Sequence, residues 1–311
     1  MATFQLPSAK TNLPIFLAGP TATGKSAVAL ALAEKIGGEI ISVDSMQVYR
    51  GLDIGTAKPS PSERARVPHH LLDICDLHEA FDAAQFIRHA QRAVAEIQSR
   101  GRMPIFCGGT GLYFKAFLEG LGEAPATDAK LRAELENAPL TQLLEELRAT
   151  DPEAYEKIDQ QNPRRVVRAV EVIRLTGKKF SQQRAEWKTP DSKLQTQNYF
   201  CFTRAAADLH RRINDRVDEM FARGLVDETR ELLQHGLAEN KFAMQAIGYR
   251  QVAEHLRGEH DLGNTIELVK IRTRQFAKRQ LTWFRRHGNC QWIELAEKES
   301  APVTLAKHFR Q

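Results

Sequence analysis

The chain has 311 residues, 42% of them hydrophobic, which is enough for a sizeable core in one large domain or two smaller ones. Its mean hydropathy of −0.42 and the absence of any apolar run near ~18 residues predict no membrane span, and residues 1–12 lack a signal-peptide-like apolar stretch. The formal charge of +5 favours a polyanionic partner only mildly, and four widely spaced cysteines predict reduced thiols in a cytoplasmic protein, without a zinc site or disulfide framework.

Three short apolar runs in the first part of the chain predict buried strands, each followed by a loop of small or polar residues. These runs cover 13–18, 39–43 and 103–107. Helical patterns lie between them at 26–36 and 81–100. Because strands and helices alternate, we predict a mostly parallel α/β sheet with its ligand site at the carboxyl ends of the strands.

The composition changes near residue 123. Residues 123–188 are rich in Glu, Arg and Leu, have a helical pattern and lack strand-like runs. We therefore predict a helical insertion domain at 124–195, inside a core domain formed by 1–123 and 196–311.

After the insertion, the run 199–203 predicts a strand that returns to the sheet, and everything from residue 205 onward is expected to be helical. The longest predicted helix spans 264–286, with Asn264 as its N-cap. It carries a basic stripe of Lys270, Arg274 and Lys278, spaced by four residues. It also carries a separate, more apolar stripe, which consists of Ile266, Val269, Thr273, Phe276, Gln280 and Trp283.

Basic side chains gather at two places in the predicted helices. One is the helix just described, and the other begins after Pro163 with Arg164, Arg165 and Arg168. Such clusters are typical of solvated helix faces and equally of surfaces that contact a nucleic-acid backbone. Charge alone does not decide between these alternatives.

Residues 19–26 match the phosphate-loop pattern G-x-x-x-x-G-K-[ST]. In this pattern backbone N–H groups curl around phosphate oxygens, the lysine supplies a positive charge and the serine hydroxyl is a ligand for Mg²⁺. The predicted strand before it and helix after it make a chance match improbable. The residues are Gly19, Pro20, Thr21, Ala22, Thr23, Gly24, Lys25 and Ser26.

Further polar groups follow the predicted strands. Asp44 is suited to a general base or an indirect metal holder, and equally to capping the next turn. Thr110, within the glycine-rich segment 108–111, is suited to contact a metal or phosphate, although an ordinary tight turn explains it as well. His69 and His70 are adjacent, so their side chains point apart on an extended chain, which favours a structural role over a metal site.

Combined, these motifs resemble the tRNA dimethylallyltransferases, also called tRNA isopentenyl transferases, over nearly the whole chain. DSMQVY followed by GTAKP is far more specific than the phosphate loop alone. The zinc-finger extension of some eukaryotic members is not seen, which is typical of the bacterial form. The matching segments are GPTATGKS at 19–26, DSMQVYRGLDIGTAKP at 44–59, VPHHLLD at 67–73, GGTGLY at 108–113, QNPRRVVRA at 161–169, RINDRV at 212–217, QAIGYRQ at 245–251 and RTRQFAKRQLTWFR at 272–285.

The resemblance implies a P-loop NTPase-like α/β fold and a transfer of the dimethylallyl group from dimethylallyl diphosphate to N6 of adenosine 37, in tRNAs that read UNN codons. The phosphate loop and Arg216 would bind the diphosphate instead of ATP. Asp44 would be the general base, assisted by Lys25, Thr110 and Arg216, and Mg²⁺ would be the cofactor, held by Ser26 and Thr110.

The same resemblance implies that a monomer binds the anticodon stem-loop and that the insertion at 124–195 clamps the stem. The implied tRNA contacts are Asp44, Ser45, Met46, Gln47, Thr110, Arg132, Gln161, Asn162, Pro163, Arg164, Arg165, Gln245, Ala246, Ile247, Gly248, Tyr249 and Arg250.

Three alternatives remain open from the residues. A P-loop kinase of a small metabolite would share the strand, phosphate loop and helix, but it would not need the insertion or the basic clusters. A transferase that prenylates free AMP would not need an RNA clamp. A nucleotide-gated RNA-binding protein would leave Asp44 without a role.

Overall fold

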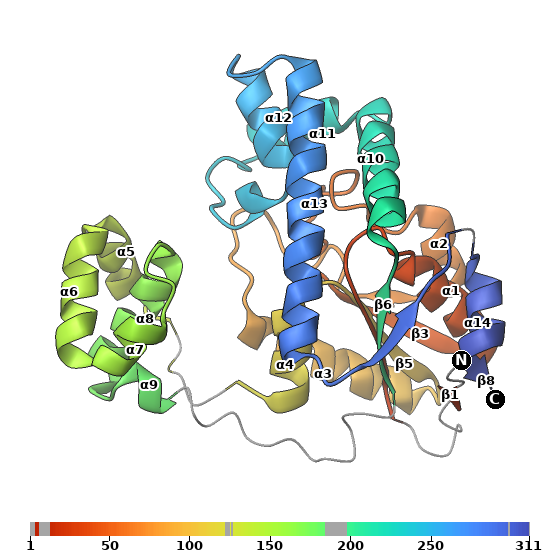
Figure 1. Cartoon of the computed structure of the whole chain (residues 1–311), viewed down its shortest axis with the longest axis horizontal. Coiled ribbons are helices and arrows are strands. Elements are labelled where there is room, and N and C mark those ends of the chain that lie inside the picture. The colour runs from red at the N-terminus through yellow and green to blue at the C-terminus, as the bar shows by residue number, and fades with distance from the viewer. Residues whose placement is uncertain are drawn as a thin grey trace. The chain divides into compact units, whose positions relative to one another are not determined.

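The computed structural model describes residues 4–5, 13–121, 125, 127–183, 198–297 and 299–310. The chain divides into two compact units (Figure 1). The first comprises Met1–Leu118 and Asp191–Gln311, and the second comprises Glu119–Pro190. None of the described helices is long and apolar enough to cross a membrane.

A six-stranded sheet forms the centre of the first unit, and every neighbouring pair in it is parallel. The predicted parallel α/β core and its four predicted strands are therefore confirmed. In spatial order the strands are β4 (His69–His70), β3 (Gly38–Val43), β5 (Met103–Gly108), β2 (Ile15–Ala18), β6 (Tyr199–Thr203) and β7 (Gln291–Glu294).

The prediction that the chain is helical from residue 205 onward is wrong at two short strands, β7 and the two-residue strand at Phe309–Arg310. Only Ile293 is buried in β7, a four-residue edge strand, so the local pattern is too short and too polar to indicate a strand. Pairing with β6 supplies the hydrogen bonds that define it. A second, two-stranded sheet pairs β1 (Phe4–Gln5) with β8 (Phe309–Arg310).

Helices cover both faces of the large sheet, as a parallel sheet requires. Successive strand residues point to opposite faces, so Ile15 and Leu17 join one buried cluster while Phe16 and Ala18 join the other. The predicted helices 26–36 and 81–100 are confirmed as α1 and α3. The helices of this unit are α1 (Lys25–Ile36), α2 (Pro61–Arg66), α3 (Ala83–Ser99), α4 (Gly111–Glu119), α10 (Ala206–Ala222), α11 (Leu225–Gln234), α12 (Tyr249–Leu256), α13 (Leu262–His287) and α14 (Ala301–His308), with a 3-10 turn at Ala243–Gln245.

The long helix α13 differs from its prediction at both its start and its buried face. Its N-cap is Asp261, whose carboxylate accepts the backbone N–H of Asn264, so Asn264 lies inside the first turn. Phe276, expected in the apolar stripe, is 36% exposed, and Ala277 is buried in its place. Because α10 packs along α13, Ala277 meets Ile213 of that helix.

Two of the three residues in the basic stripe of α13 contact side chains of α10. Lys270 forms an ion pair with Asp218, and Arg274 donates a hydrogen bond to the Asn214 amide oxygen. Of the three predicted stripe residues, only Lys278 is exposed. The stripe of Lys270, Arg274 and Lys278 is therefore not a continuous exposed surface, although Arg272, Arg279, Arg285 and Arg286 of the same helix are exposed.

The second unit consists of helices packed around their own small core, with no strand among its described residues. The helical prediction for 123–188 is confirmed wherever the structure describes it. Leu143 and Leu147 pack here against Val166 and Val170. The helices are α5 (Ala129–Asn137), α6 (Leu140–Thr150), α7 (Pro152–Lys157), α8 (Pro163–Thr176) and α9 (Phe180–Gln183). The last residues of the predicted segment, 184–188, lie outside the described residues.

All four cysteines are free thiols, namely Cys75, Cys107, Cys201 and Cys290. Burial raises the pKa of the Cys107 thiol to about 11, so this thiol stays protonated at neutral pH.

A buried carboxylate joins β3, β4 and the end of α3. The Glu39 side chain is 3% exposed and accepts hydrogen bonds from Arg100 and from the His70 ring, each at 2.7 Å. Burial disfavours its charged form, but the hydrogen bonds from Arg100 and His70 outweigh that effect and lower the pKa of Glu39 below its ordinary value. The contact gives His70 the structural role favoured by the sequence, and His69 bonds a different partner, the Val67 carbonyl.

We predict that Glu39→Gln lowers the free energy of unfolding by about 2 kcal/mol at neutral pH, because it removes the charge of a buried carboxylate that accepts charged hydrogen bonds. The folded pKa is depressed, so the carboxylate's contribution is complete above the ordinary glutamate pKa of 4.5 and is lost as the pH falls through the lower folded value. Urea titrations should therefore show the two proteins converging in acid. Glu96→Gln, which removes an exposed pair with Arg92, should have a much smaller effect.

Candidate active site

The phosphate loop connects β2 to α1, and two arginines hold its backbone, one directly after β6 and one in α10. Arg204 donates from Nε to the Thr23 carbonyl at 2.7 Å, and Arg212 donates from Nε to the Ala22 carbonyl at 2.9 Å. The Thr23 hydroxyl donates to the Pro20 carbonyl. The loop backbone is therefore held from outside at the Ala22 and Thr23 carbonyls and from within at the Pro20 carbonyl.

Two cations converge at this loop. Burial lowers the pKa of the Lys25 ammonium, the neighbouring Arg216 lowers it further, and Asp44 opposes the change. Burial likewise lowers the pKa of Arg216, whose closest hydrogen-bond partner is the Thr21 hydroxyl at 3.5 Å. Neither cation has a carboxylate ion-pair partner among the described residues. An anion such as a phosphate group would offset both the burial and the mutual repulsion.

Gln280 of α13 bridges the phosphate loop and the glycine-rich loop after β5. Its Oε1 accepts the Thr21 N–H and its Nε2 donates to the Gly109 carbonyl, both at 2.9 Å. A Cβ on Gly109 would come within 2.2 Å of that amide nitrogen, which explains the glycine. The sequence placed Gln280 in an apolar stripe, and no local signal indicated its contacts with two loops.

Asp44 and Thr110 meet at the next strand ends. The Asp44 Oδ1 accepts the backbone N–H groups of Met46 and Gln47 at 2.9 and 3.3 Å. Thr110 accepts the Ser45 N–H at its hydroxyl at 3.1 Å. Hydrogen bonds from the described residues reach only Oδ1, so Oδ2 of Asp44 remains available to accept a proton. The turn-capping contact suggested for Asp44 is therefore present, and its role as a general base stays a prediction.

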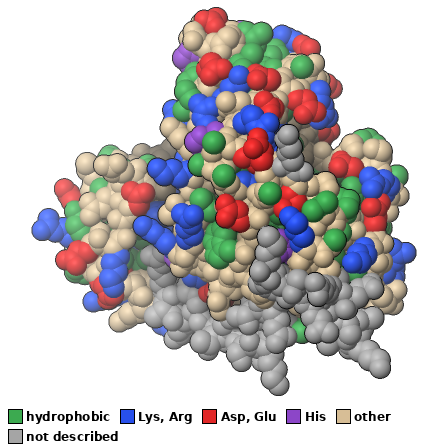
Figure 2. Space-filling model, turned by 45° about the vertical axis from the view of Figure 1, so that its right-hand side comes forward, with side chains coloured by type: hydrophobic (Ala, Val, Ile, Leu, Met, Phe, Trp, Pro, Cys, Tyr) green, Lys and Arg blue, Asp and Glu red, His purple; other side chains and the backbone are tan. Residues whose placement is uncertain are grey.

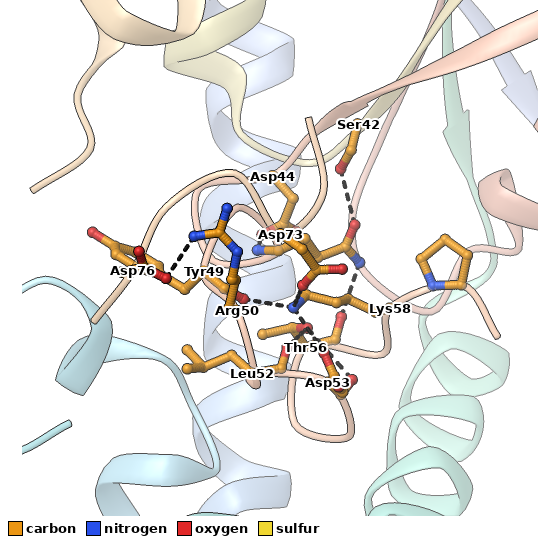
Figure 3. A network of polar contacts seen from close by, with 12 residues as sticks. Ser42, Asp44, Tyr49, Arg50, Leu52, Asp53, Thr56, Lys58, Asp73 and Asp76 are labelled. Carbon is orange, nitrogen blue, oxygen red and sulfur yellow. Dashed lines mark hydrogen bonds and ion pairs between the residues drawn. The ribbon is translucent and has the colours of Figure 1, made fainter. Parts of the chain in front are cut away.

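Gln47 is fixed from two sides. Its Oε1 accepts the Ser42 hydroxyl at 2.9 Å, and its Nε2 donates to the Thr56 and Ala57 carbonyls at 3.1 and 3.4 Å. Figure 3 shows Ser42 and Asp44 beside the turn that contains Thr56. The side chain therefore ties the residues after Asp44 to the turn 53–58.

Lys58 holds the other end of that turn (Figure 3). Its ammonium group is 1% exposed and contacts the Tyr49 carbonyl at 2.5 Å, Asp53 at 2.8 Å and Asp73 at 2.5 Å. Arg64 pairs with the second oxygen of Asp73. A buried lysine with two carboxylate partners is a strong local cross-link.

A cavity joins the phosphate loop to the residues around Gln47. Its polar lining residues include Ser26, Ser42 and Arg216. Its apolar lining residues include Leu30, Ile40, Ile54 and Met220. A cavity lined by both cationic and apolar side chains suits a ligand that combines a phosphate group with a hydrocarbon.

The predicted tRNA contacts in the second unit surround the start of α8. Asn162 caps this helix by accepting the Arg165 N–H, Pro163 is its first residue, and Gln161, Arg164 and Arg165 are exposed. Arg132 is held differently: it and Arg168 both bond the carboxylate of Glu171, which is fully buried, at 2.7 and 2.6 Å. That carboxylate fixes the direction of two arginines at once.

The predicted contacts at 245–250 are mostly inside the protein. Tyr249 is 0% exposed and Ala246 is 4% exposed, and the Gly248 N–H donates to the Gln251 side chain. Gln245 and Arg250 are the members whose side chains are exposed. Figure 2 shows Lys and Arg side chains interspersed with Asp and Glu over the visible face, so the net charge alone outlines no RNA surface there.

Residues 47–287 match the family model described as IPP transferase. The tRNA dimethylallyltransferase of Geobacter metallireducens is 47% identical, over 96% of this chain and 98% of that protein. The tRNA dimethylallyltransferase of Geobacter sulfurreducens is 44% identical, over 96% and 97%.

Solved structures agree with these relatives. The full-length tRNA isopentenylpyrophosphate transferase of Bacillus halodurans has a TM-score of 0.69 and 38% identity, covering 95% of this chain and 94% of that one. A eukaryotic dimethylallyltransferase acting on tRNA has a TM-score of 0.75 and 30% identity, covering 90% and 73%. The P-loop NTPase-like fold predicted from the motifs is confirmed. Sequence, fold and phosphate loop together place the chain in the tRNA dimethylallyltransferase family.

Proposed function

We propose that this protein transfers the dimethylallyl group from dimethylallyl diphosphate to N6 of adenosine 37 in tRNAs that read UNN codons. The products are N6-isopentenyladenosine and diphosphate. The observation that carries the proposal is a cavity beside the phosphate loop that Ser26 and Arg216 line, together with the electrostatic influence of Arg216 and Asp44 on the buried Lys25 ammonium. Names of relatives and solved neighbours support tRNA as the acceptor, and no observation favours a kinase or an AMP-prenylating enzyme.

The donor's diphosphate belongs in the phosphate loop. Negative charge develops on it as the allylic C–O bond breaks, and Lys25, Arg216 and the N-terminus of α1 are placed to stabilise that charge. The apolar cavity wall, with Leu30 and Ile54, suits the hydrocarbon part.

Mg²⁺ fits this donor set. The Ser26 hydroxyl is exposed at the cavity, and the Thr110 hydroxyl accepts one hydrogen bond and keeps a second lone pair. Hydroxyl oxygens, diphosphate oxygens and water are the ligands that Mg²⁺ takes in such sites. When bound, the ion would neutralise charge on the leaving diphosphate.

The acceptor amine needs a base, because the lone pair of adenine N6 is delocalised into the ring. As the bond from N6 to the allylic carbon forms and the carbon–oxygen bond breaks, Asp44 Oδ2 takes the N6 proton. The adenosine must leave its stack to reach this carboxylate, which costs less in a single-stranded loop than in a duplex.

The tRNA surface extends beyond the cavity in this proposal. The anticodon stem-loop contacts Gln161, Arg164 and Arg165 of the second unit, together with Gln245 and Arg250 of the first. A monomeric state and a cytoplasmic location remain predictions from the sequence.

The direct test is transfer itself. Purified protein with Mg²⁺ and labelled dimethylallyl diphosphate should label a tRNA that carries adenosine 37, and mass analysis of the digested tRNA should find N6-isopentenyladenosine. Substituting guanosine at position 37 should abolish the label. Absence of label on every adenosine-37 tRNA, or ATP turnover without tRNA, would contradict the proposal.

We predict that Asp44→Asn lowers kcat by about 10²- to 10⁴-fold, because an amide still caps the turn through its oxygen but accepts no proton. Affinity for tRNA should change little, as measured by filter binding. An unchanged rate would remove Asp44 from the role of base.

We predict that Lys25→Met weakens binding of inorganic pyrophosphate by about 10- to 100-fold, the usual worth of a charged hydrogen bond. Titration calorimetry with Mg²⁺ measures this without any catalysis. Lys35→Met, in the last turn of the same helix and exposed, is the matched control and should bind pyrophosphate like the wild type.

A further inference from the structure

Glu228 of α11 holds two backbone amides of the turn 53–58. Its carboxylate accepts the Ile54 N–H at 3.0 Å and the Gly55 N–H at 3.4 Å. It also accepts the hydroxyl hydrogen of Tyr249 at 2.5 Å. One carboxylate therefore fixes a turn that lies 174 residues earlier in the chain.

Tyr249 completes this anchor. Its hydroxyl donates to Glu228 and accepts the Gly55 N–H at 3.0 Å. Burial and the Glu228 carboxylate raise the pKa of Tyr249, so the hydroxyl keeps its proton and remains a donor. A Cβ on Gly55 would lie 2.5 Å from the Tyr249 ring, so the turn packs directly on it. Tyr249 therefore holds the turn through a hydrogen bond and through direct packing of its ring on Gly55.

The opposite side of the same turn holds Gln47. The Thr56 and Ala57 carbonyls accept its amide, while the adjoining Ile54 and Gly55 amides are bound to Glu228. Displacement of the turn would therefore move the side chain of Gln47, and with it the residues that follow Asp44.

We propose that Glu228, acting with Tyr249, is a positioning residue that sets the place of Gln47 beside Asp44, and thereby holds the acceptor base in line with the donor. This inference rests on the function proposed above. Tyr249 opens α12 immediately before Arg250, a proposed tRNA contact. Glu228 and Tyr249 therefore connect the proposed tRNA contact at Arg250 with the proposed tRNA contacts at 44–47.

The test compares Glu228→Gln with Glu231→Gln, an exposed glutamate three residues along the same helix. Glutamine offers one acceptor oxygen, and its NH₂ group would face N–H donors. Tyr249→Phe removes only the hydroxyl and serves as a second variant. Hydrogen exchange of the peptide spanning 44–49 is measured first, without any substrate.

Exchange at 44–49 should rise in Glu228→Gln and Tyr249→Phe but not in Glu231→Gln. Pyrophosphate affinity should be unchanged in all three, because the phosphate loop makes none of these contacts. If protection at 44–49 matches the wild type in both anchor variants, the proposal is overturned.

Transfer kinetics supply the second arm. Glu228→Gln should lower kcat/KM for tRNA by about 10- to 100-fold, the usual effect of a small misplacement of a reacting group. In a Gln47→Ala background, Glu228→Gln should lower kcat/KM for tRNA almost no further. Both substitutions break the same connection, which runs from Glu228 through the turn 53–58 to Gln47. Additive losses would mean that Glu228 acts elsewhere. A wild-type protein without transfer activity would refute the proposed function, while hydrogen exchange would still decide the positioning role.

Discussion

The last residues of three parallel strands lie side by side. Gly108 of β5 pairs in register with Ala18 of β2 on one side and with Val43 of β3 on the other. A loop follows each strand at the same edge of the sheet. The phosphate loop follows β2, the residues from Asp44 onward follow β3, and the turn at Thr110 follows β5. The convergence of cations, carboxylate and hydroxyl follows from this register, because a shift of one residue would turn each strand's side chains to the opposite face.

Register brings the loops together, but it does not fix them. Side chains far along the chain hold them in place. Gln280, 259 residues after Thr21, joins the phosphate loop to Gly109, and Arg204 holds the Thr23 carbonyl from 181 residues away. Both side chains are nearly fully buried, and each satisfies backbone groups that would otherwise be buried without partners. The loops are therefore preorganised by the fold and do not depend on their own sequences alone.

This division explains what the sequence could and could not predict. The phosphate loop, the strands and α1 are encoded locally, by glycines and apolar runs, and these predictions hold. Gln280, Glu228 and Arg204 carry no local signal, because their roles exist only when distant segments meet. The short strand β7 was missed for the same reason, since its hydrogen bonds come from β6. For Tyr249 the local motif implied a tRNA contact, but its side chain is buried.

The phosphate loop by itself does not identify a reaction. Lys25 and Arg216 would stabilise a phosphoryl donor as well as a leaving diphosphate. The strand β5 separates β3 from β2, so the loops that begin at Gly19 and Asp44 start about 10 Å apart by ordinary strand spacing. That span accommodates a phosphate group and a reacting carbon, but it would also suit a kinase acceptor.

The residues behind Asp44 make the distinction. Gln47 is held by the carbonyls of the turn 53–58, and that turn is held in its own right by Lys58 and Glu228. A small, freely diffusing acceptor has less need of two successive layers of hydrogen bonds behind Asp44. An adenine that has left its stack in a tRNA loop has that need, because its N6 must stay aligned with both the carboxylate and the allylic carbon while the rest of the RNA remains outside the cavity. The hydrogen-bond network behind Asp44 thus suits the alignment that the proposed base alkylation requires.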